Sequence, residues 1–377
     1  MKRILHISKY YFPFRGGTEQ IAQDCVNALI ENYEQKVICF NDSSEDRIDE
    51  VDGIEIIRAG TFATISSQGL SKSIGKKLKQ VIDDFNPDII VFHYPNPFVS
   101  MYLLRYIPDS TKLVVYWHLD IVKQKLLKNL FINQNKRLIE RADKLIATSP
   151  PYVEGSPYLS SAREKCVVIP NCINEKRLQL NTEVEERAKE IRDENVDKII
   201  CFAVGRHTKY KGFDYLIKSA HLLDDRFQIY IAGKGEETER LKKEAGGDKK
   251  IHFLGQISEL DLKAYMSAMD IFCFPSITKN EAFGLALAEA MYFEKPVVTF
   301  SIPGSGVNYV SVNGITGIEV SNRNVVEYAN AILRLGNSDN ERREYGIYGK
   351  ERVLKMFMYD QFQDRTIRLF GDLLHNE

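Results

Sequence analysis

Short apolar runs alternate with longer amphipathic stretches along the whole chain. In the first half the apolar runs occupy residues 4–7, 36–40, 54–58, 89–93, 113–117, 144–147 and 167–169. In the second half they occupy residues 199–204, 228–232, 251–253, 271–274, 296–300 and 317–320. Runs of strand length that alternate with helical patterns of about 10–15 residues are typical of βαβ units. The alternation therefore predicts an α/β protein with parallel sheets.

A charged stretch without a strand pattern, residues 175–198, separates the two halves. The length of 377 residues also fits two domains of ordinary size. We therefore expect an N-terminal domain over residues 1–172 and a C-terminal domain over residues 173–357. A C-terminal helix, 358–377, is expected to pack back on the first domain. Both domains are predicted to be doubly wound and to face each other across a cleft, where open α/β sheets bind ligands.

Composition narrows the functional classes. The chain has 44% hydrophobic and 27% charged residues, as ordinary globular proteins do, and its net charge of −1 gives no support for nucleic-acid binding. Its six cysteines are scattered without a Cys-x-x-Cys pair, which indicates reduced thiols in a cytoplasmic protein. No apolar stretch approaches the roughly 18 residues of a membrane span. No signal-peptide pattern follows Met1.

Two glutamates stand eight positions apart just after the apolar run that ends at Pro275. Eight residues are a little over two helical turns, so Glu281 and Glu289 lie close to one face. Glu281 is expected in a loop and Glu289 inside the following helix. The helix start, Phe283-Gly284-Leu285, offers free backbone N–H groups to an anion. This layout suits a sugar nucleotide; the alternative is an amphipathic helix with two solvated glutamates.

A basic loop, Gly205-Arg206 to Lys211-Gly212, directly follows the apolar run 199–204. Glycine at the carboxyl end of a strand allows a tight turn, which leaves Arg206 and Lys211 over the cleft. Arginine binds phosphate in a bidentate manner and lysine acts as a point charge, so the pair suits a diphosphate. Two cations also stabilise a diphosphate leaving group without a metal. The alternative is an ordinary basic turn at a helix start.

Together, the basic loop and the Glu-x7-Glu segment resemble the donor-binding motifs of retaining glycosyltransferases of family 4. That family has the GT-B fold of two Rossmann-like domains, and it transfers a hexose from a nucleotide-sugar donor. The resemblance places Arg206 and Lys211 on the donor diphosphate. It places Glu281 on the transferred sugar and Glu289 on the ribose hydroxyls.

The first half carries two further segments that resemble the family. Phe12–Glu19 is similar to its glycine loop, in which Gly16 and Gly17 approach the donor phosphate and the acceptor. Absence of a Cβ permits that close backbone approach. His118 occupies a position similar to the active-site histidine of the family. It is expected to contact the transferred sugar through its side chain or its backbone carbonyl.

Other segments match less closely or depart from the family pattern. The loops that contain Gly233-Lys234 and Ile257 resemble those that hold the nucleotide base. Cys172 replaces the glycine usual in a Pro-Asn-Gly segment near the hinge, which puts the local turn in doubt. The stretch 303–310 departs from the Gly-Gly-x-x-Glu turn of many relatives. This variant resembles the branch that builds O-antigen and capsule chains on lipid carriers.

The resemblance leaves the donor base open between uracil and guanine, with thymine as an occasional choice. No Asp-x-Asp, the usual metal-binding signature of the single-domain transferases, occurs in the chain, so we expect neither a metal nor another cofactor. The acceptor hydroxyl is expected to attack from the face that the phosphate leaves. An ion-pair intermediate and a covalent step both remain open.

The acceptor is expected to be a saccharide, and the lipid-carrier branch suggests that it is lipid-linked. Basic and apolar residues interleave over residues 123–137, which suits contact with the anionic inner face of the plasma membrane. The residues concerned are Lys123, Lys125, Leu126, Leu127, Lys128, Leu130, Phe131, Lys136 and Arg137. A solvated basic face is the alternative.

Three other functions compete with that of a lipid-directed transferase. An NAD-dependent enzyme would need Gly-x-Gly-x-x-Gly after the first strand, and the sequence 15–19 fails that test. A non-catalytic sugar-binding module would be free to lose Arg206, Lys211 or Glu281, and all three are present. A soluble transferase that acts on a small molecule or a sugar phosphate stays open.

Overall fold

A computed structural model of the chain describes residues 1–14, 16–65, 68–120 and 128–375. The chain divides into two compact units. Unit 1 comprises Met1–Asn171 with Asp360–Glu377, and unit 2 comprises Cys172–Tyr359. The sequence placed the two boundaries after residues 172 and 357, so the structure shifts them by one and two residues.

Unit 1 is built on an eight-stranded sheet with the order β10-β9-β8-β7-β1-β2-β4-β3. Its strands are β1 (Arg3–Ile7), β2 (Glu34–Phe40), β3 (Arg47–Val51), β4 (Ile54–Ala59), β7 (Ile89–Tyr94), β8 (Lys112–Trp117), β9 (Lys144–Ala147) and β10 (Cys166–Val168). All neighbours pair in parallel except β3, which is antiparallel to β4. A separate hairpin joins β5 (Ala63–Ile65) and β6 (Gln68–Leu70).

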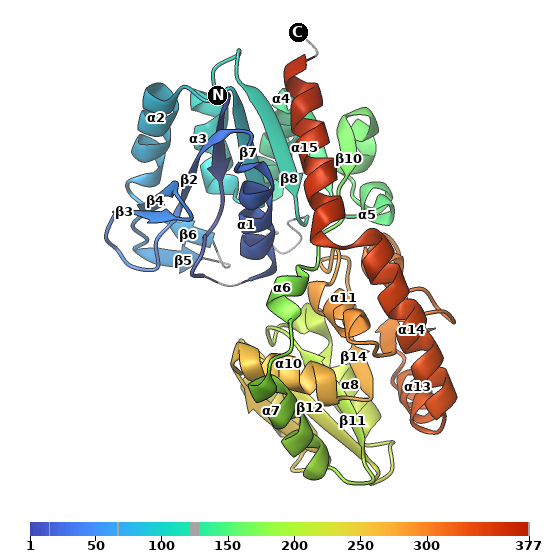
Figure 1. Cartoon of the computed structure of the whole chain (residues 1–377). Helices are drawn as coiled ribbons and strands as arrows, with labels where there is room; N and C mark the ends of the chain where they lie inside the picture. The colour runs from blue at the N-terminus through green and yellow to red at the C-terminus, as the bar shows by residue number, and fades with distance from the viewer. Residues whose placement is uncertain (15, 66–67, 121–127, 376–377) are drawn as a thin grey trace. The chain divides into compact units, whose positions relative to one another are not determined.

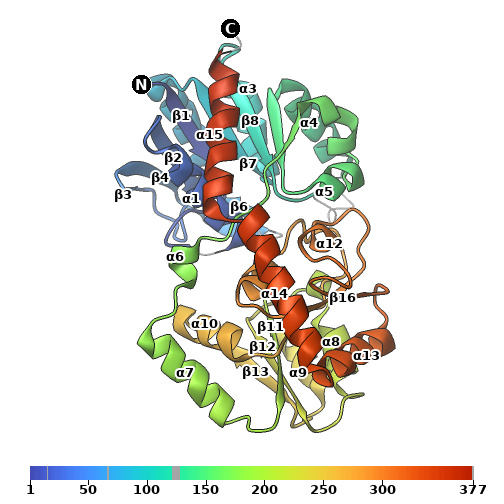
Figure 2. The same ribbon diagram turned by 45° about the vertical axis from the view of Figure 1, so that its right-hand side comes forward.

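Helices cover the sheet of unit 1 (Figure 1). They are α1 (Gly17–Leu29), α2 (Ile74–Phe85), α3 (Pro97–Tyr106), α4 (Lys128–Arg141), α5 (Pro150–Gly155), the 3-10 helix η1 (Leu159–Lys165) and α15 (Tyr359–His375). Local chemistry sets their starts: Asn96 caps α3 by accepting a hydrogen bond from Val99 N at 3.2 Å, with Pro97 in the first turn. The α15 helix runs alongside the sheet of unit 1 (Figure 2). It packs there through buried apolar side chains such as Phe370, which contacts Tyr33 edge-on.

Unit 2 contains a six-stranded, all-parallel sheet with the order β13-β12-β11-β14-β15-β16. The strands are β11 (Ile199–Val204), β12 (Phe227–Ala232), β13 (Ile251–Gly255), β14 (Ile271–Phe274), β15 (Val297–Phe300) and β16 (Gly317–Val320). The helices are α6 (Glu175–Leu178), α7 (Thr182–Asp193), η2 (Lys209–Lys211), α8 (Phe213–Ala220), α9 (Thr238–Ala245), α10 (Glu259–Ala268), α11 (Leu285–Tyr292), α12 (Val307–Val310), α13 (Val325–Gly336) and α14 (Asp339–Met356). The α7 and α10 helices lie side by side (Figure 2). An ion pair between Arg187 and Asp261 joins them.

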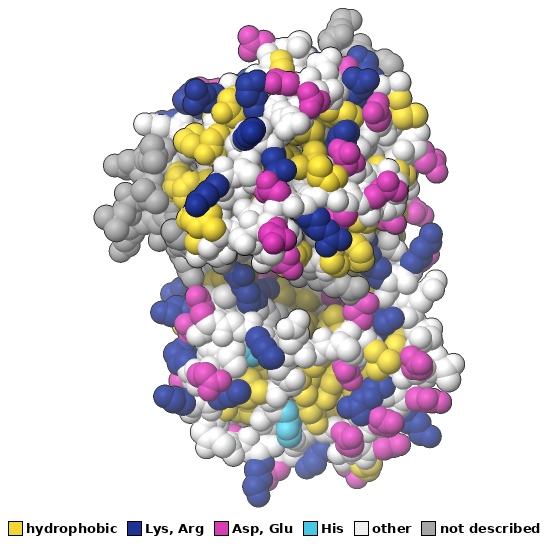
Figure 3. Space-filling view, turned by 90° about the vertical axis from the view of Figure 1, so that its left-hand side faces the viewer, with side chains coloured by type: hydrophobic (Ala, Val, Ile, Leu, Met, Phe, Trp, Pro, Cys, Tyr) yellow, Lys and Arg dark blue, Asp and Glu magenta, His cyan; other side chains and the backbone are white. Residues whose placement is uncertain are grey.

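Two Rossmann-like α/β units with largely parallel sheets confirm the predicted fold class. The β3 strand and the β5–β6 hairpin were not predicted. The reason is visible in β3, where charged residues flank the exposed Ile48, so no apolar run marks the strand. Within the described ranges, no helix is both long enough and apolar enough to cross a membrane. On the face drawn in Figure 3, Lys and Arg side chains are interspersed with Asp and Glu.

Candidate active site

The loops predicted to bind the donor diphosphate and sugar lie at the carboxyl ends of two strands in unit 2. Residues 205–212 follow β11, and residues 275–284 follow β14. These strands are adjacent, and the strand order reverses between them: β12 and β13 extend to one side, β15 and β16 to the other. Such a reversal is the usual ligand site of an open α/β sheet. The two sequence motifs therefore meet where the topology itself favours a ligand.

An ion pair joins the two motifs. Lys211 Nζ donates to Glu281 Oε2 at 2.5 Å, and the side chains are only 14% and 12% exposed. Ser276 Oγ donates to the same carboxylate oxygen at 3.1 Å, and Ser305 Oγ donates to the Glu281 backbone carbonyl. The carboxylate of Glu281 is thus held by two groups and its backbone by a third. The sequence did not single out Ser276 or Ser305, because isolated serines in loops carry no spacing signal.

The environment of Lys211 keeps its ammonium group charged. Burial, the largest single influence, lowers the pKa of Lys211, but the charge and hydrogen bond of Glu281 together with Tyr210 outweigh it, so the net pKa is raised. The ammonium also lies 5.1 Å from the centre of the Phe274 ring and 5.7 Å from that of Tyr210. Aromatic faces attract a cation. Unit 2 therefore presents a fixed, partly desolvated positive charge at the end of its central strands.

Two glycines make room for this arrangement. A Cβ at Gly205 would lie 3.4 Å from Lys211 Cε, so the lysine stem runs directly over the glycine. Gly233 has a φ of +116°, and a Cβ there would lie 2.0 Å from the carbonyl oxygen of Gly205. Only glycine combines that conformation with such close approach. The loops after β11 and β12 are consequently packed backbone to backbone.

The second predicted glutamate lies inside α11, as the sequence indicated. Gly284, with a φ of +93°, immediately precedes this helix, and the buried Phe283 packs edge-on against Phe357. Leu285 is the first helical residue. Burial raises the pKa of Glu289 to about 7, and the charge of Arg177 opposes this shift only in part. The two carboxylates thus differ: Glu281 is paired with a cation, whereas Glu289 titrates near neutrality.

The other residues of unit 2 that the sequence predicts to bind the donor lie near the same strand ends. Arg206 is exposed at the start of the basic loop, and its charge acts on Lys211 by lowering the pKa of that lysine. Lys234 is exposed after β12, and its carbonyl accepts a hydrogen bond from His207 N at 3.0 Å. Gly233 N donates to Gly255 O at 2.7 Å, which ties the loops after β12 and β13 together. Ile257, just beyond, is half-buried against the core of unit 2.

His118 lies at the end of β8 in unit 1 and is buried. Its Nε2 is 3.1 Å from His93 Nδ1, its ring stacks on Tyr116, and its backbone N–H donates to Tyr94 O at 3.1 Å. Burial lowers the pKa of His118 to about 3, so the imidazole is neutral at physiological pH. No sequence pattern pointed to His93, because its part in holding His118 depends on the pairing of β7 with β8.

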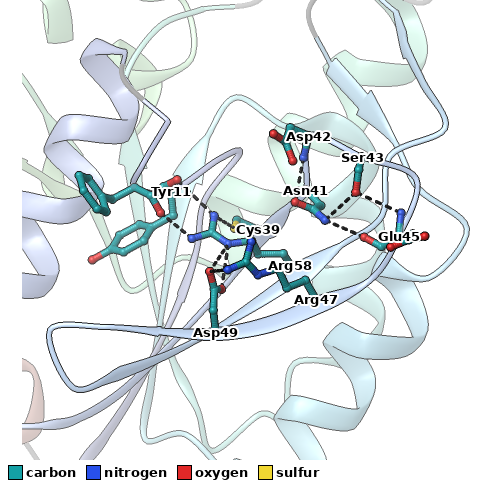
Figure 4. Close-up of polar contacts among 10 residues, drawn as sticks. Tyr11, Cys39, Asn41, Asp42, Ser43, Glu45, Arg47, Asp49 and Arg58 are labelled. Carbon is teal, nitrogen blue, oxygen red and sulfur yellow. Dashed lines mark hydrogen bonds and ion pairs between the residues drawn. The ribbon is translucent and has the colours of Figure 1, made fainter.

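The glycine loop of unit 1 starts from a segment held by a buried arginine (Figure 4). Arg58, on β4, donates to Tyr11 O at 3.2 Å and to Phe12 O at 2.5 Å, and its Nε is 2.9 Å from Asp49 Oδ1. Its side chain is 3% exposed. Gly16 follows four residues after Phe12 as the extended N-cap of α1, and Gly17 is the first helical residue. Arg58 therefore fixes the root of this loop, a role that its position in an ordinary strand concealed.

Comparison with known proteins identifies the family. The family model for glycosyl transferases group 1 matches residues 184–352, and the model for glycosyltransferase family 4 matches residues 15–177. The chain is a family 4 glycosyltransferase. Over its full length this glycosyltransferase is 29% identical to the O-antigen chain mannosyltransferase C of Escherichia coli, which it covers completely. It is 26% identical to D-rhamnosyltransferase WbpZ of Pseudomonas aeruginosa, with 94% of this chain and 92% of that one aligned.

Solved structures support the fold of this glycosyltransferase. Sucrose-phosphate synthase from Thermosynechococcus elongatus superposes with a TM-score of 0.81 at 19% identity, with both chains fully covered. Anabaena Alr3699/HepE, in complex with UDP and glucose, gives a TM-score of 0.78 at 16% identity over 98% of this chain and 100% of that one. Both likenesses confirm the GT-B architecture predicted from the sequence.

Arg58 allows a test of loop positioning. We expect Arg58→Met to lower the free energy of unfolding by about 2–4 kcal/mol, because Asp49 and two carbonyl groups lose their donor. Urea denaturation measures this change. Arg47→Ala is the matched control, since Arg47 pairs with the same Asp49 at 3.4 Å but is 65% exposed. That exposed pair should contribute less than about 1 kcal/mol. Equal effects of the two substitutions would contradict the anchoring role.

Proposed function

We propose that this glycosyltransferase moves a hexose, with retention of configuration, from a UDP- or GDP-sugar to a hydroxyl of a lipid-linked saccharide. The observation that carries the proposal is the Lys211–Glu281 pair at the strand-order reversal of unit 2. The full-length similarity to transferases of mannose and rhamnose supports a hexose and a polysaccharide product. The fold likeness to a protein in complex with UDP and glucose is consistent with a nucleotide-sugar donor.

In this proposal Lys211 and Arg206 neutralise the departing diphosphate. Charge develops on the leaving phosphate in the transition state, and a preorganised cation in a partly desolvated site stabilises it without reorganisation. Lys211 is already charged and positioned against Phe274 and Tyr210. Glu281, held by Ser276, is placed to accept hydrogen bonds from hydroxyls of the transferred sugar. The acceptor hydroxyl attacks from the leaving-group face, and a phosphate oxygen takes its proton.

Glu289 is assigned to the ribose, and residues of unit 1 to the sugar and the acceptor. A carboxylate within α11 accepts hydrogen bonds from vicinal hydroxyls once it is ionised. Gly233, Lys234 and Ile257 line the loops proposed for the base. His118 contributes its backbone carbonyl or Nδ1, since its Nε2 is engaged with His93. Gly16 and Gly17 allow the backbone to approach the donor phosphate and the acceptor.

A soluble acceptor is the second candidate, and one observation favours it. The membrane proposal called for apolar side chains of residues 123–137 to face outward. Residues 123–127 and the side chains of 128–130 lie outside the described residues. Phe131, however, is buried and contacts Phe98 edge-on, so it packs within unit 1 and is unavailable to a lipid surface. Lys136 and Arg137 are exposed, which leaves an electrostatic contact as the described part of the membrane proposal.

Lys211 provides the test of the diphosphate assignment. We expect Lys211→Ala to reduce kcat/KM by about 10²–10³, the range for loss of one preorganised electrostatic group. Lys209→Ala, an exposed change in the same short helix, is the matched control and should be near wild type. Because two cations replace a metal in this scheme, adding Mg²⁺ or Mn²⁺ to chelator-treated wild type should not raise the rate. Wild-type turnover of Lys211→Ala would refute the assignment.

The two glutamates are separated by nucleotide titration across pH. With a pKa near 7, Glu289 becomes ionised between about pH 6 and pH 8, so affinity for UDP or GDP should rise over that interval. Glu289→Ala should weaken nucleotide binding by about tenfold or more and remove the pH dependence. Glu281→Ala should bind nucleotide normally and lose turnover. Calorimetry measures both affinities, and the opposite pattern would reverse the two roles.

Vesicle binding decides between the acceptor classes. We expect the protein to sediment with phosphatidylglycerol vesicles, less so as salt shortens the Debye length from about 10 Å at 0.1 M. Replacing Lys136 and Arg137 by Glu should weaken this binding. The same double change at Lys242 and Lys243, exposed on α9, serves as the control. Binding that ignores lipid charge, or fails at low salt, would favour the soluble acceptor.

A further inference from the structure

Three buried side chains with metal-binding chemistry meet inside unit 1. They are His6 on β1, His93 on β7 and Cys25 on α1, and each is at most 3% exposed. One potential ligand atom from each lies within 4.8 Å of those of the other two. These residues are far apart in the sequence, so their spacing matches no metal-binding motif. The fold alone brings them together, between α1 and the sheet.

The strand register explains the meeting. His6 pairs with Val91 on β7, so His93, two residues further along β7, points to the same face of the sheet as His6. Cys25 belongs to the buried side of α1. The three side chains therefore lie together inside the fold. They are not an exposed cluster, of the kind that commonly binds metal ions adventitiously.

Hydrogen bonds fix the free nitrogen of His6. Gln35 Nε2 donates to Val26 O at 3.0 Å, which turns the amide oxygen of Gln35 toward His6 Nε2 at 2.8 Å. The hydrogen of His6 therefore resides on Nε2, and Nδ1 carries a lone pair. Among the described residues, Nδ1 has no hydrogen-bond partner. A histidine that donates one ring N–H to a carbonyl group and leaves the other nitrogen free has the arrangement typical of metal ligands.

His93 presents the same pattern. Its Nδ1 is 3.1 Å from His118 Nε2, and its Nε2 is a buried nitrogen without a hydrogen-bond partner in the described part of the chain. Burial, with the neighbouring histidines adding to it, lowers the pKa of His93, and burial lowers that of His6 to about 4. Both imidazoles are consequently neutral at physiological pH, the form that binds a metal.

We propose that His6 Nδ1, His93 Nε2 and Cys25 Sγ bind one soft d10 cation, Zn²⁺ or Cu⁺. Imidazole and thiolate ligands suit these ions and disfavour Mg²⁺, Ca²⁺ and Mn²⁺. The ion forms a bond to sulfur as the thiol proton leaves to solvent, so the site gains one thiolate charge. Burial, with the charge of the adjacent Asp24 adding to it, raises the pKa of the Cys25 thiol to about 12, so the thiolate forms only when the cation binds and displaces the proton. The proposal does not depend on the sugar-transfer function assigned above.

The geometry requires only a modest contraction. Zinc lies about 2.0–2.1 Å from nitrogen and 2.3 Å from sulfur, which sets ligand atoms roughly 3.5 Å apart in a tetrahedral site. Atoms that are within 4.8 Å of one another reach this spacing by shifts of about 1 Å. Three protein ligands satisfy a trigonal Cu⁺ site, or leave one position of a Zn²⁺ site for water.

Metal binding would also determine the state of His118. A cation on His93 Nε2 uses that lone pair, so the ring hydrogen of His93 must reside on Nδ1 and be donated to His118 Nε2. The hydrogen of neutral His118 then resides on its own Nδ1. His93 thereby acts as a positioning residue, and the ion selects one tautomer of His118.

Metal content of the full-length protein tests the site. The reduced protein is stripped with a chelator, dialysed against Zn²⁺ or Cu⁺, and analysed by mass spectrometry for metal. We expect about one ion per chain and a rise in Tm on the order of 5 °C. The two arms show which ion is preferred. With Co²⁺ as a probe, a thiolate charge-transfer band should appear in the near ultraviolet.

Two variants and one control complete the experiment. His6→Gln and Cys25→Ser should each lose the bound ion and the Co²⁺ band, while Cys166→Ser, outside the cluster in the same unit, should keep both. The proposal is overturned if folded wild type retains less than about 0.1 ion per chain with both Zn²⁺ and Cu⁺, whatever the variants do. Retention of the ion and the band by both variants overturns the assignment equally.

Discussion

The buried pair of Lys211 and Glu281 is the interaction on which the proposed donor site of unit 2 depends. A partly desolvated lysine beside an exposed arginine would be costly without a counter-charge, and removing one partner of a buried pair is usually strongly destabilising. The surrounding features serve this pair. Gly205 leaves space for the lysine stem, Ser276 holds the carboxylate, and the parallel sheet brings together Lys211 and Glu281, which are 70 residues apart in sequence. In the free protein Glu281 therefore stands where substrate groups are proposed to lie.

Much of this arrangement could be predicted from the sequence because buried parallel strands consist of continuous apolar runs. The run 199–204 and the run 271–274 both became central strands, and the loops that follow them carry the motifs. Elements without such apolar runs, such as β3, were not predicted. The β3 strand consists mostly of charged residues, and its identity rests on pairing with β4, which no local pattern encodes.

The partners of the predicted residues were harder to foresee than the residues themselves. These partners make their contacts with other parts of the chain, and each belongs to a residue type that is common in strands and loops. They are Arg58, His93, Ser276 and Ser305. In the sequence, Arg58 only interrupts an apolar run. Its role follows from its hydrogen bonds to the carbonyl groups of Tyr11 and Phe12, which the sequence does not reveal. The prediction for Phe131 was wrong for a related reason. An apolar residue among cations suggested a lipid-binding surface, but Phe131 packs against Phe98 inside unit 1.

Unit 2 is an insertion whose two ends are tied together. Ile173 N donates to Phe357 O at 2.6 Å, and Tyr359 N donates to Ile173 O at 3.0 Å, so its first and last residues are neighbours. The chain then returns to unit 1 through α15, whose Phe370 packs on Tyr33. A ribosome therefore releases all of unit 2 before it has supplied the helix that finishes unit 1. Unit 1 begins before unit 2 in the chain but is complete only after unit 2 has been made, and the apolar surface that α15 covers stays open until then.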